Sequence, residues 1–178
     1  MVINILLILA IVIVVFFIVA ALRPPGFRVE RSATIAASPA IVFDHVNDLK
    51  NYQAWNPWSK LEPSTEHTFS GPAAGVGASL AWAGKKIGAG RLTISESLPA
   101  ELVRMKLEFI KPFVANNTAE FFFRAESGQT VVNWSMSGVN NCMFRAMGLL
   151  INMDKMVGKE FENGLANLKG LAEAAARK

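Results

Sequence analysis

The sequence has very few of the side chains from which most metal and thiol-based catalytic sites are built. It contains one cysteine, Cys142, and two histidines, His45 and His67, among 178 residues. A single cysteine excludes a disulfide within the chain, and so few thiol and imidazole groups argue strongly against a zinc site. The G-x-S-x-G motif, paired-histidine metal motifs and a phosphate-binding glycine loop are also absent. We therefore assign no catalytic residue, no metal and no cofactor from such motifs.

Charge is missing from residues 1–22, where Asn4 is the only residue outside the apolar set. As a helix rising about 1.5 Å per residue, residues 2–22 would be about 31 Å long, which is the thickness of a hydrocarbon core. We predict one transmembrane anchor over residues 1–22. The alternative is a cleaved signal peptide, because Val19-Ala20-Ala21 resembles a cleavage site. The lack of a basic residue before the segment and its length favour the anchor.

The basic residues beside this segment predict its orientation. No lysine or arginine precedes it, whereas Arg23, Arg28 and Arg31 follow it closely. Positively charged flanks tend to stay on the cytoplasmic side of a membrane. We therefore expect a single-pass membrane protein whose globular part faces the cytoplasm.

The rest of the chain reads as one domain. Residues 23–26, Arg-Pro-Pro-Gly, interrupt the helix and predict a short linker, and residues 27–178 follow as the domain. Residues 23–178 carry all 18 basic and all 14 acidic side chains, for a net charge of +4. Basic and acidic residues are interleaved and form no basic stripe with stacking aromatics, so we predict no nucleic-acid partner.

Alternating apolar and polar residues predict seven strands. In the first, Val29, Ala33 and Ile35 share one face, and Glu30 and Thr34 lie on the other. Connections this short, without helical crossovers, require antiparallel pairing. The combined sheet should have one face rich in aromatic residues and methionine. The predicted strands are 27–35, 67–70, 78–83, 87–95, 102–109, 118–124 and 130–137.

Two helices complete the predicted α+β architecture. Ser38-Pro39 is typical of an N-cap followed by the first helical residue, and that helix should run to about Leu49. Residues 142–175 contain no proline and should form one long helix that covers the apolar face of the sheet. One face of this helix carries Met147, Ile151, Asp154, Gly158, Phe161, Leu165, Leu168 and Ala172.

Asp154 and Gly158 interrupt that apolar face. A missing side chain leaves room, so we predict a cavity between the helix and the sheet with one carboxylate in its wall. The alternative is that the row drifts around the helix and Asp154 points to solvent. Phe161, Leu165 and Leu168 should pack on the sheet next to the cavity. The candidate ligand-binding residues are Trp82, Met105, Leu107, Phe121, Phe123, Trp134, Met136, Ile151, Asp154 and Gly158.

An aromatic group follows the first helix. Tyr52, Trp55 and Trp58 either form a gate at the mouth of the cavity or seal the end of the core. Sequence alone leaves both interpretations open.

Two sets of residues are typical of one superfamily. The first is Arg31-Ser32, Ile35-x-Ala37-x-Pro39-x-x-Val42-Phe43, Asp48, Trp55 and Pro57-Trp58. The second is Met153-Asp154-x-x-x-Gly158-x-x-Phe161-x-x-Gly164-Leu165-x-x-Leu168-Lys169. With them the chain resembles the START/SRPBCC superfamily, in its polyketide cyclase/dehydrase-like branch, over nearly all of residues 27–175.

The resemblance implies a helix-grip fold, in which a curved seven-stranded antiparallel sheet wraps around a long C-terminal helix and an apolar cavity. It implies no single activity, because one fold hosts several functions. We favour a membrane-anchored binding domain for a hydrophobic small molecule or lipid. A cyclase- or dehydrase-like enzyme is the alternative, with Asp154 as its acid–base group if burial raises the pKa of that carboxyl. A protein-interaction module with an unknown partner is the third hypothesis.

Overall fold

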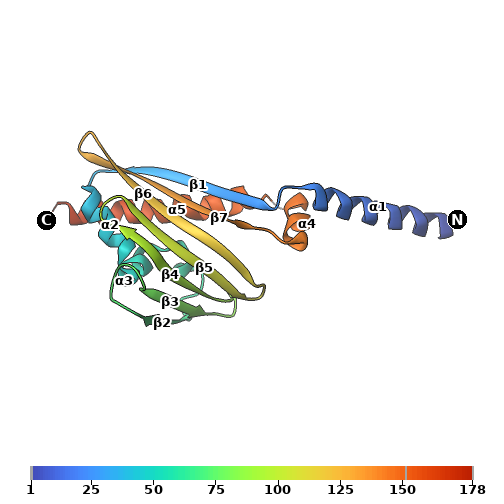
Figure 1. The fold of residues 1–178 in the computed structure, drawn as a ribbon, viewed down its shortest axis with the longest axis horizontal. Helices are drawn as coiled ribbons and strands as arrows, with labels where there is room; N and C mark the ends of the chain where they lie inside the picture. Colours follow the sequence, from blue (N-terminus) through green and yellow to red (C-terminus); the bar gives the residue numbers. More distant parts are fainter. Residues whose placement is uncertain (1, 151, 178) are drawn as a thin grey trace.

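Seven antiparallel strands form one curved sheet in the computed structural model, which describes residues 2–150 and 152–177 (Figure 1). The strand order β1-β7-β6-β5-β4-β3-β2 shows that β2 to β6 each pair with the next strand in sequence, while β1 pairs with β7. All seven predicted strands are confirmed, with ends shifted by a few residues. They are β1 (Gly26–Ile35), β2 (Glu66–Ser70), β3 (Ser79–Ala83), β4 (Ala89–Leu98), β5 (Leu102–Lys111), β6 (Ala115–Glu126) and β7 (Gln129–Val139).

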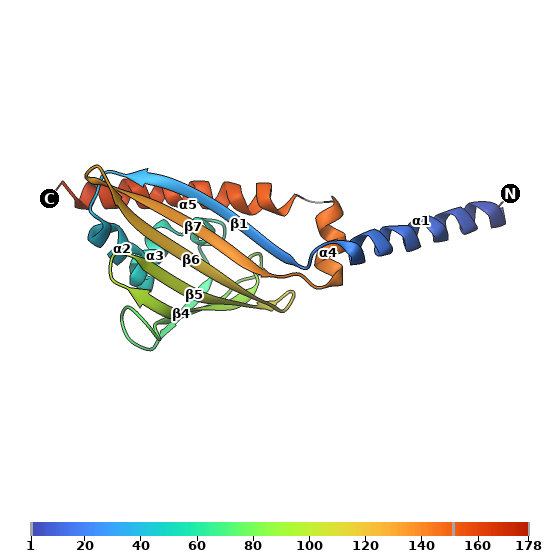
Figure 2. The same cartoon turned by 45° about the horizontal axis from the view of Figure 1, so that its top comes forward.

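The long C-terminal helix of the helix-grip fold is present, but it begins later than predicted. The segment from Cys142 is not one helix: α4 (Cys142–Leu150) ends first, and α5 (Met153–Ala175) starts a new helix. Asn152 Oδ1 accepts a hydrogen bond of 2.9 Å from the backbone N–H of Lys155, which caps α5. Figure 2 shows α5 running alongside β1 within the curve of the sheet.

The first predicted helix is also divided. It forms α2 (Pro39–Asn47) and α3 (Leu49–Trp55), and the 3-10 turn η1 (Pro57–Lys60) follows. Asp48 lies between the two helices in an extended conformation, and its carboxylate accepts a 2.7 Å hydrogen bond from the backbone N–H of Lys50. This cap starts α3 in a new direction, so the aromatic segment is helical and is not an open connection.

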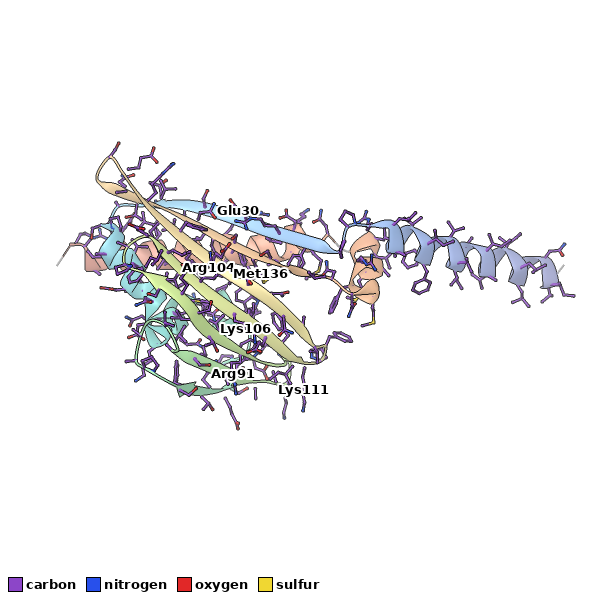
Figure 3. All side chains as sticks on the ribbon, viewed as in Figure 1. Glu30, Arg91, Arg104, Lys106, Lys111 and Met136 are labelled. Atoms are coloured by element: carbon purple, nitrogen blue, oxygen red, sulfur yellow. The ribbon has the colours of Figure 1, made fainter. Side chains whose placement is uncertain are left out.

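Aromatic stacking joins α5 to the sheet. The ring of Trp134 lies parallel to that of Phe161, with centroids 3.9 Å apart, and also stacks on Phe121 at 5.0 Å. Leu165 and Leu168 are buried in the same core, as predicted. The outer face of the sheet is charged instead: Arg104 pairs with Glu96 and Glu120, and it lies with Arg91 and Lys106 on β4 and β5 in Figure 3.

The apolar N-terminal helix α1 (Val2–Leu22) extends away from the domain and is mostly exposed (Figure 1). It is long and apolar enough to cross a membrane, and a signal sequence would have the same properties. Its end is fixed to α4, because the Arg145 guanidinium donates hydrogen bonds to the carbonyl oxygens of Ala21, at 3.0 Å, and of Arg23, at 3.2 Å.

Candidate functional site

A cavity of about 670 Å³ lies between the concave face of the sheet, the first half of α5, α3 with η1, and α4. Its walls are mostly apolar. Four of the candidate residues line it as predicted: Trp82, Leu107, Trp134 and Met136. The cavity therefore lies where the sequence placed it, between the sheet and the C-terminal helix.

Three other candidates lie in the packed core and do not line the cavity. Met105, Phe121 and Phe123 point to the same concave face, but helices fill the space in front of them. Phe123 meets the edge of Phe43 on α2 at 5.8 Å, and Phe121 meets Trp55 on α3 at the same centroid distance. The sequence pattern identified the correct face and could not show how much of it α2 and α3 cover. Another candidate, Ile151, lies outside the described residues.

Asp154 and Gly158 do not line the cavity either, which corrects that part of the prediction. The row of α5 that faces the cavity is Met153, Val157 and Phe161. Asp154 and Gly158 each follow a cavity-facing residue, Met153 or Val157, by one position, and they therefore point about 100° further around the helix axis. Asp154 and Gly158 face β1 instead.

Arg31 occupies the space above Gly158. Its guanidinium lies where a Cβ at position 158 would be, and it donates hydrogen bonds to Glu162 at 2.9 Å and to Asp154 at 3.1 and 3.2 Å. The Asp154 side chain is 60% exposed, and its hydrogen bond with Arg31 lowers the pKa of the carboxyl below its usual value. Asp154 thus lacks the raised pKa that the acid–base hypothesis requires.

Replacing Gly158 with leucine should therefore destabilise the domain by about 1 kcal/mol, because the new side chain must displace the flexible Arg31 guanidinium from its ion pairs with largely exposed carboxylates. In an Arg31→Ala background the same replacement should be neutral or should stabilise by up to about 1 kcal/mol, since the space is free and glycine disfavours helix. Denaturant unfolding of the wild type and the three variants in this cycle measures the coupling. Additive effects would show that Arg31 does not fill the gap.

The cavity opens at the end of the domain from which α1 departs. Val114 and Phe113, in the loop between β5 and β6, line it and are exposed, as is Val139 at the end of β7. Phe113 meets Phe144 of α4 edge-on, with ring centroids 5.7 Å apart. Figure 1 shows the turn between β5 and β6 on the same side of the domain as α4 and α1. These mouth residues were missed in the sequence, although an apolar pair directly after Lys111-Pro112 is unusual in an exposed turn.

The aromatic group after the first helix lies at the wall between cavity and core. Trp55 is fully buried, and its indole N–H donates a 2.8 Å hydrogen bond to the carbonyl oxygen of His45. Tyr52 and Trp58 do line the cavity, and Trp58 meets the edges of Trp134 and Phe161. Trp55 therefore seals the core, as one of the two interpretations held, while its neighbours Tyr52 and Trp58 form part of the cavity wall.

The Glu62 side chain hydrogen-bonds to the backbone of the turn that leads into β4. Its carboxylate accepts hydrogen bonds from the backbone N–H groups of Lys85 at 2.9 Å, Lys86 at 2.8 Å and Ile87 at 3.2 Å, and Ile87 lines the cavity. These backbone hydrogen bonds lower the pKa of the Glu62 carboxyl from its usual 4.5. No sequence motif marks this role.

This lowered pKa predicts an acid-sensitive contribution to stability. Because the folded pKa lies below the unfolded value of 4.5, the contribution is complete above pH 4.5 and is lost as the pH falls through the folded pKa. In thermal melts at pH 7, the wild type should have a higher Tm than Glu62→Gln, and this difference in Tm should become smaller as the pH falls. Glu66→Gln, an exposed change on β2, is the control and should track the wild type. If the difference in Tm between the wild type and Glu62→Gln is the same at every pH, the assignment of a lowered pKa to Glu62 is wrong.

The cavity wall also contains polar atoms. Within residues 2–150 and 152–177, Trp134 Nε1 and Gln53 Oε1 are buried atoms without a hydrogen-bond partner, and both side chains line the cavity. One is a donor and the other an acceptor. In the same described part of the chain no three His, Cys, Asp or Glu side chains converge as metal ligands would.

The curved sheet, the gripped helix and the apolar cavity define a helix-grip domain of the kind that binds hydrophobic molecules. Residues 26–173 match the family described as polyketide cyclase / dehydrase and lipid transport. The chain belongs to this family, and the superfamily resemblance found in the sequence is confirmed.

Solved structures share the fold at low sequence identity. Protein CV1439 from Chromobacterium violaceum is 16% identical over 85% of this chain and 99% of its own, with a TM-score of 0.60. The Aha1 dimer from Colwellia psychrerythraea is 16% identical over 83% of this chain and 96% of its own, with a TM-score of 0.60. The di-domain ARO/CYC StfQ from the steffimycin biosynthetic pathway is 13% identical over 86% of this chain and 52% of its own, with a TM-score of 0.62. No curated protein sequence matches the chain.

Proposed function

We propose that this chain is a single-pass, membrane-anchored domain that reversibly binds a hydrophobic small molecule or lipid in the cavity between sheet and α5. The observation that carries this proposal is the apolar cavity itself, with its mouth at the end where α1 departs. A volume of about 670 Å³ falls in the range of small-molecule sites. Transfer of each buried methylene from water contributes roughly 0.8 kcal/mol, so an acyl-like chain supplies enough free energy for binding.

Polar side chains in the wall refine the chemistry of this ligand. Asn56, His67 and Asn117 line the cavity among mostly apolar residues, so part of the wall can hydrogen-bond to a polar group of the ligand. We therefore favour an amphipathic molecule with one polar group over a pure hydrocarbon.

The helix α1 is the anchor in this proposal. An uncleaved apolar helix of 21 residues holds a protein to a bilayer effectively irreversibly, which keeps the cavity where hydrophobic ligands partition. Fractionation of cells that express the full chain, followed by alkaline extraction, tests the anchor. Retention of an intact N-terminus in the extracted membrane pellet is expected, whereas a soluble product that lacks residues 1–22 would identify a cleaved signal peptide.

Titration with a fluorescent fatty acid tests the binding half of the proposal. The full chain, purified in detergent and stripped of lipid, should bind the probe saturably with one site, and long-chain competitors should displace it. A linear, unsaturable signal would mean partition into the detergent micelle alone and would contradict the proposal.

The orientation gives a further prediction. Because Arg23, Arg28 and Arg31 follow α1 closely, the domain should face the cytoplasm. Protease added to intact spheroplasts should leave the domain whole, and permeabilised cells should show its degradation. Cleavage without permeabilisation would reverse the assigned orientation.

A further inference from the structure

Exposed apolar side chains gather at the end of the domain where α1 departs. Phe113 and Val114 lie in the turn between β5 and β6, Val139 ends β7, and Met143 and Leu150 lie on α4. We call these five residues the apolar rim. Three of them, Phe113, Val114 and Val139, also line the cavity. An exposed apolar patch of this kind is typical of an interaction surface.

We propose that the apolar rim sits in the interface of the bilayer that α1 spans, so that the cavity opens directly against lipid. This inference rests on the proposed anchor. It goes further, because an anchored domain could equally be held above the membrane with its cavity open to water.

Chain geometry holds the apolar rim near the membrane surface. From Leu22, the last residue of α1, to Gly26, the first of β1, the chain spans at most about 14 Å, because each residue covers no more than about 3.6 Å. Gly26 pairs with Val139 in the sheet, which places a rim residue beside this connection.

Hydrogen bonds fix α4 at the same level. The Arg145 guanidinium binds the carbonyl oxygens of Ala21 and Arg23, and the Arg23 guanidinium donates a 3.1 Å hydrogen bond to the carbonyl oxygen of Gly148. Side chains of α4 and of the linker thus both contribute hydrogen bonds that hold α4 against the C-terminal end of α1. A short helix with exposed Met143 and Leu150 next to two arginines has the composition of an interfacial helix, whose basic groups favour anionic lipid headgroups.

A bilayer explains the location of this patch better than a protein partner does, because the patch is continuous with α1.

The opposite end of the domain provides a comparison. Val76, in the loop between β2 and β3, is 59% exposed, and its neighbour Gly75 donates a hydrogen bond to the carbonyl oxygen of Asn47 at the end of α2. Figure 1 shows α2 at the far end of the molecule from α1.

Spin-label depth measurements on the full chain in nanodiscs of phosphatidylcholine and phosphatidylglycerol test the proposal. In a Cys142→Ser background, single labels are introduced by Val114→Cys, Leu150→Cys, Val76→Cys and, within α1, Ile11→Cys. Labels at 114 and 150 should collide more with oxygen, which partitions into lipid, than with a water-soluble nickel chelate. The label at 76, a loop valine matched to Val114, should show the opposite preference.

The label in α1 separates the two proposals. If position 11 reports the bilayer core while positions 114 and 150 collide freely with the nickel chelate, the anchor stands and the membrane-facing rim is overturned. If position 11 itself is accessible to the chelate, the anchor and the rim fail together. Rim labels shielded from both reagents would show a second copy of the chain packed on the rim, which would also overturn the proposal.

Discussion

Replacing Ala119 with tryptophan is expected to abolish binding of a fluorescent fatty acid to this protein. Ala119 lines the cavity from β6, between Met105 on β5 and Met136 on β7, so a larger side chain there enters the space of the ligand. Displacing four methylenes of a bound chain loses about 3 kcal/mol, which weakens affinity more than about 100-fold. Probe titration of the detergent-purified full chain measures this loss.

The matched control lies on the same strand. Ala125 is exposed near the end of β6, and Ala125→Trp adds the same ring outside the cavity, so probe affinity should stay at the wild-type value. Thermal stability of Ala119→Trp should be unchanged or higher, because the ring fills existing space. Undiminished probe binding by a folded Ala119→Trp protein would show that the ligand binds elsewhere.

Replacing Phe121 with alanine should cause the largest loss of stability, about 3–5 kcal/mol. Its ring is fully buried and lies between Trp55, which it meets edge-on, and Trp134, on which it stacks. The truncation would leave a hole in the layer that also holds Phe161. Thermal or denaturant unfolding followed by tryptophan fluorescence measures the change.

Phe122 is a stringent control, because it is the next residue on the same strand. Its side chain points to the outer face and is 43% exposed, so Phe122→Ala should cost less than about 1 kcal/mol. Similar losses in the two variants would mean that β6 does not have the register described here.

The strands could be predicted from the sequence because the period of two is a local signal. The alternation around Phe121 and Phe123 identified both the strand and its buried face, and short connections then required antiparallel pairing. The position of the long helix against this face followed from the row of Phe161, Leu165 and Leu168. These inferences needed only the pattern and one tertiary rule, that apolar faces meet.

The error at Asp154 and Gly158 has a different origin. A row of residues spaced 3.5 positions apart drifts around a helix that has 3.6 residues per turn. In addition, the helix breaks near Asn152 and α5 starts anew at Met153. As a result, the residues of α5 that face the cavity include Met153 and Val157, one position before Asp154 and Gly158. A signal was nevertheless present in β1. Alternation places Arg31 on the inner face with Val29 and Ala33, where a charge needs a partner and space, and both come from the interrupted row of α5.

The extent of the cavity and its mouth could not be read from local patterns. Phe121 and Phe123 appeared equivalent to Trp134, but α2 and α3 cover the first two, and this covering depends on the helix break at Asp48. The mouth is formed by residues far apart in sequence, Phe113 and Phe144 among them, which meet only after the sheet has curved. Long-range shape decides such features, and a single sequence contains little information about it.

Native mass spectrometry of the full chain, released from detergent after purification from membranes, tests the central claim most directly. The account predicts a wild-type protein that retains one hydrophobic molecule, and an Ala119→Trp protein that is folded and free of it. Ala125→Trp should retain the molecule. A wild-type protein that carries no ligand, or one whose bound mass persists unchanged in Ala119→Trp, would contradict the claim that this cavity binds a hydrophobic ligand.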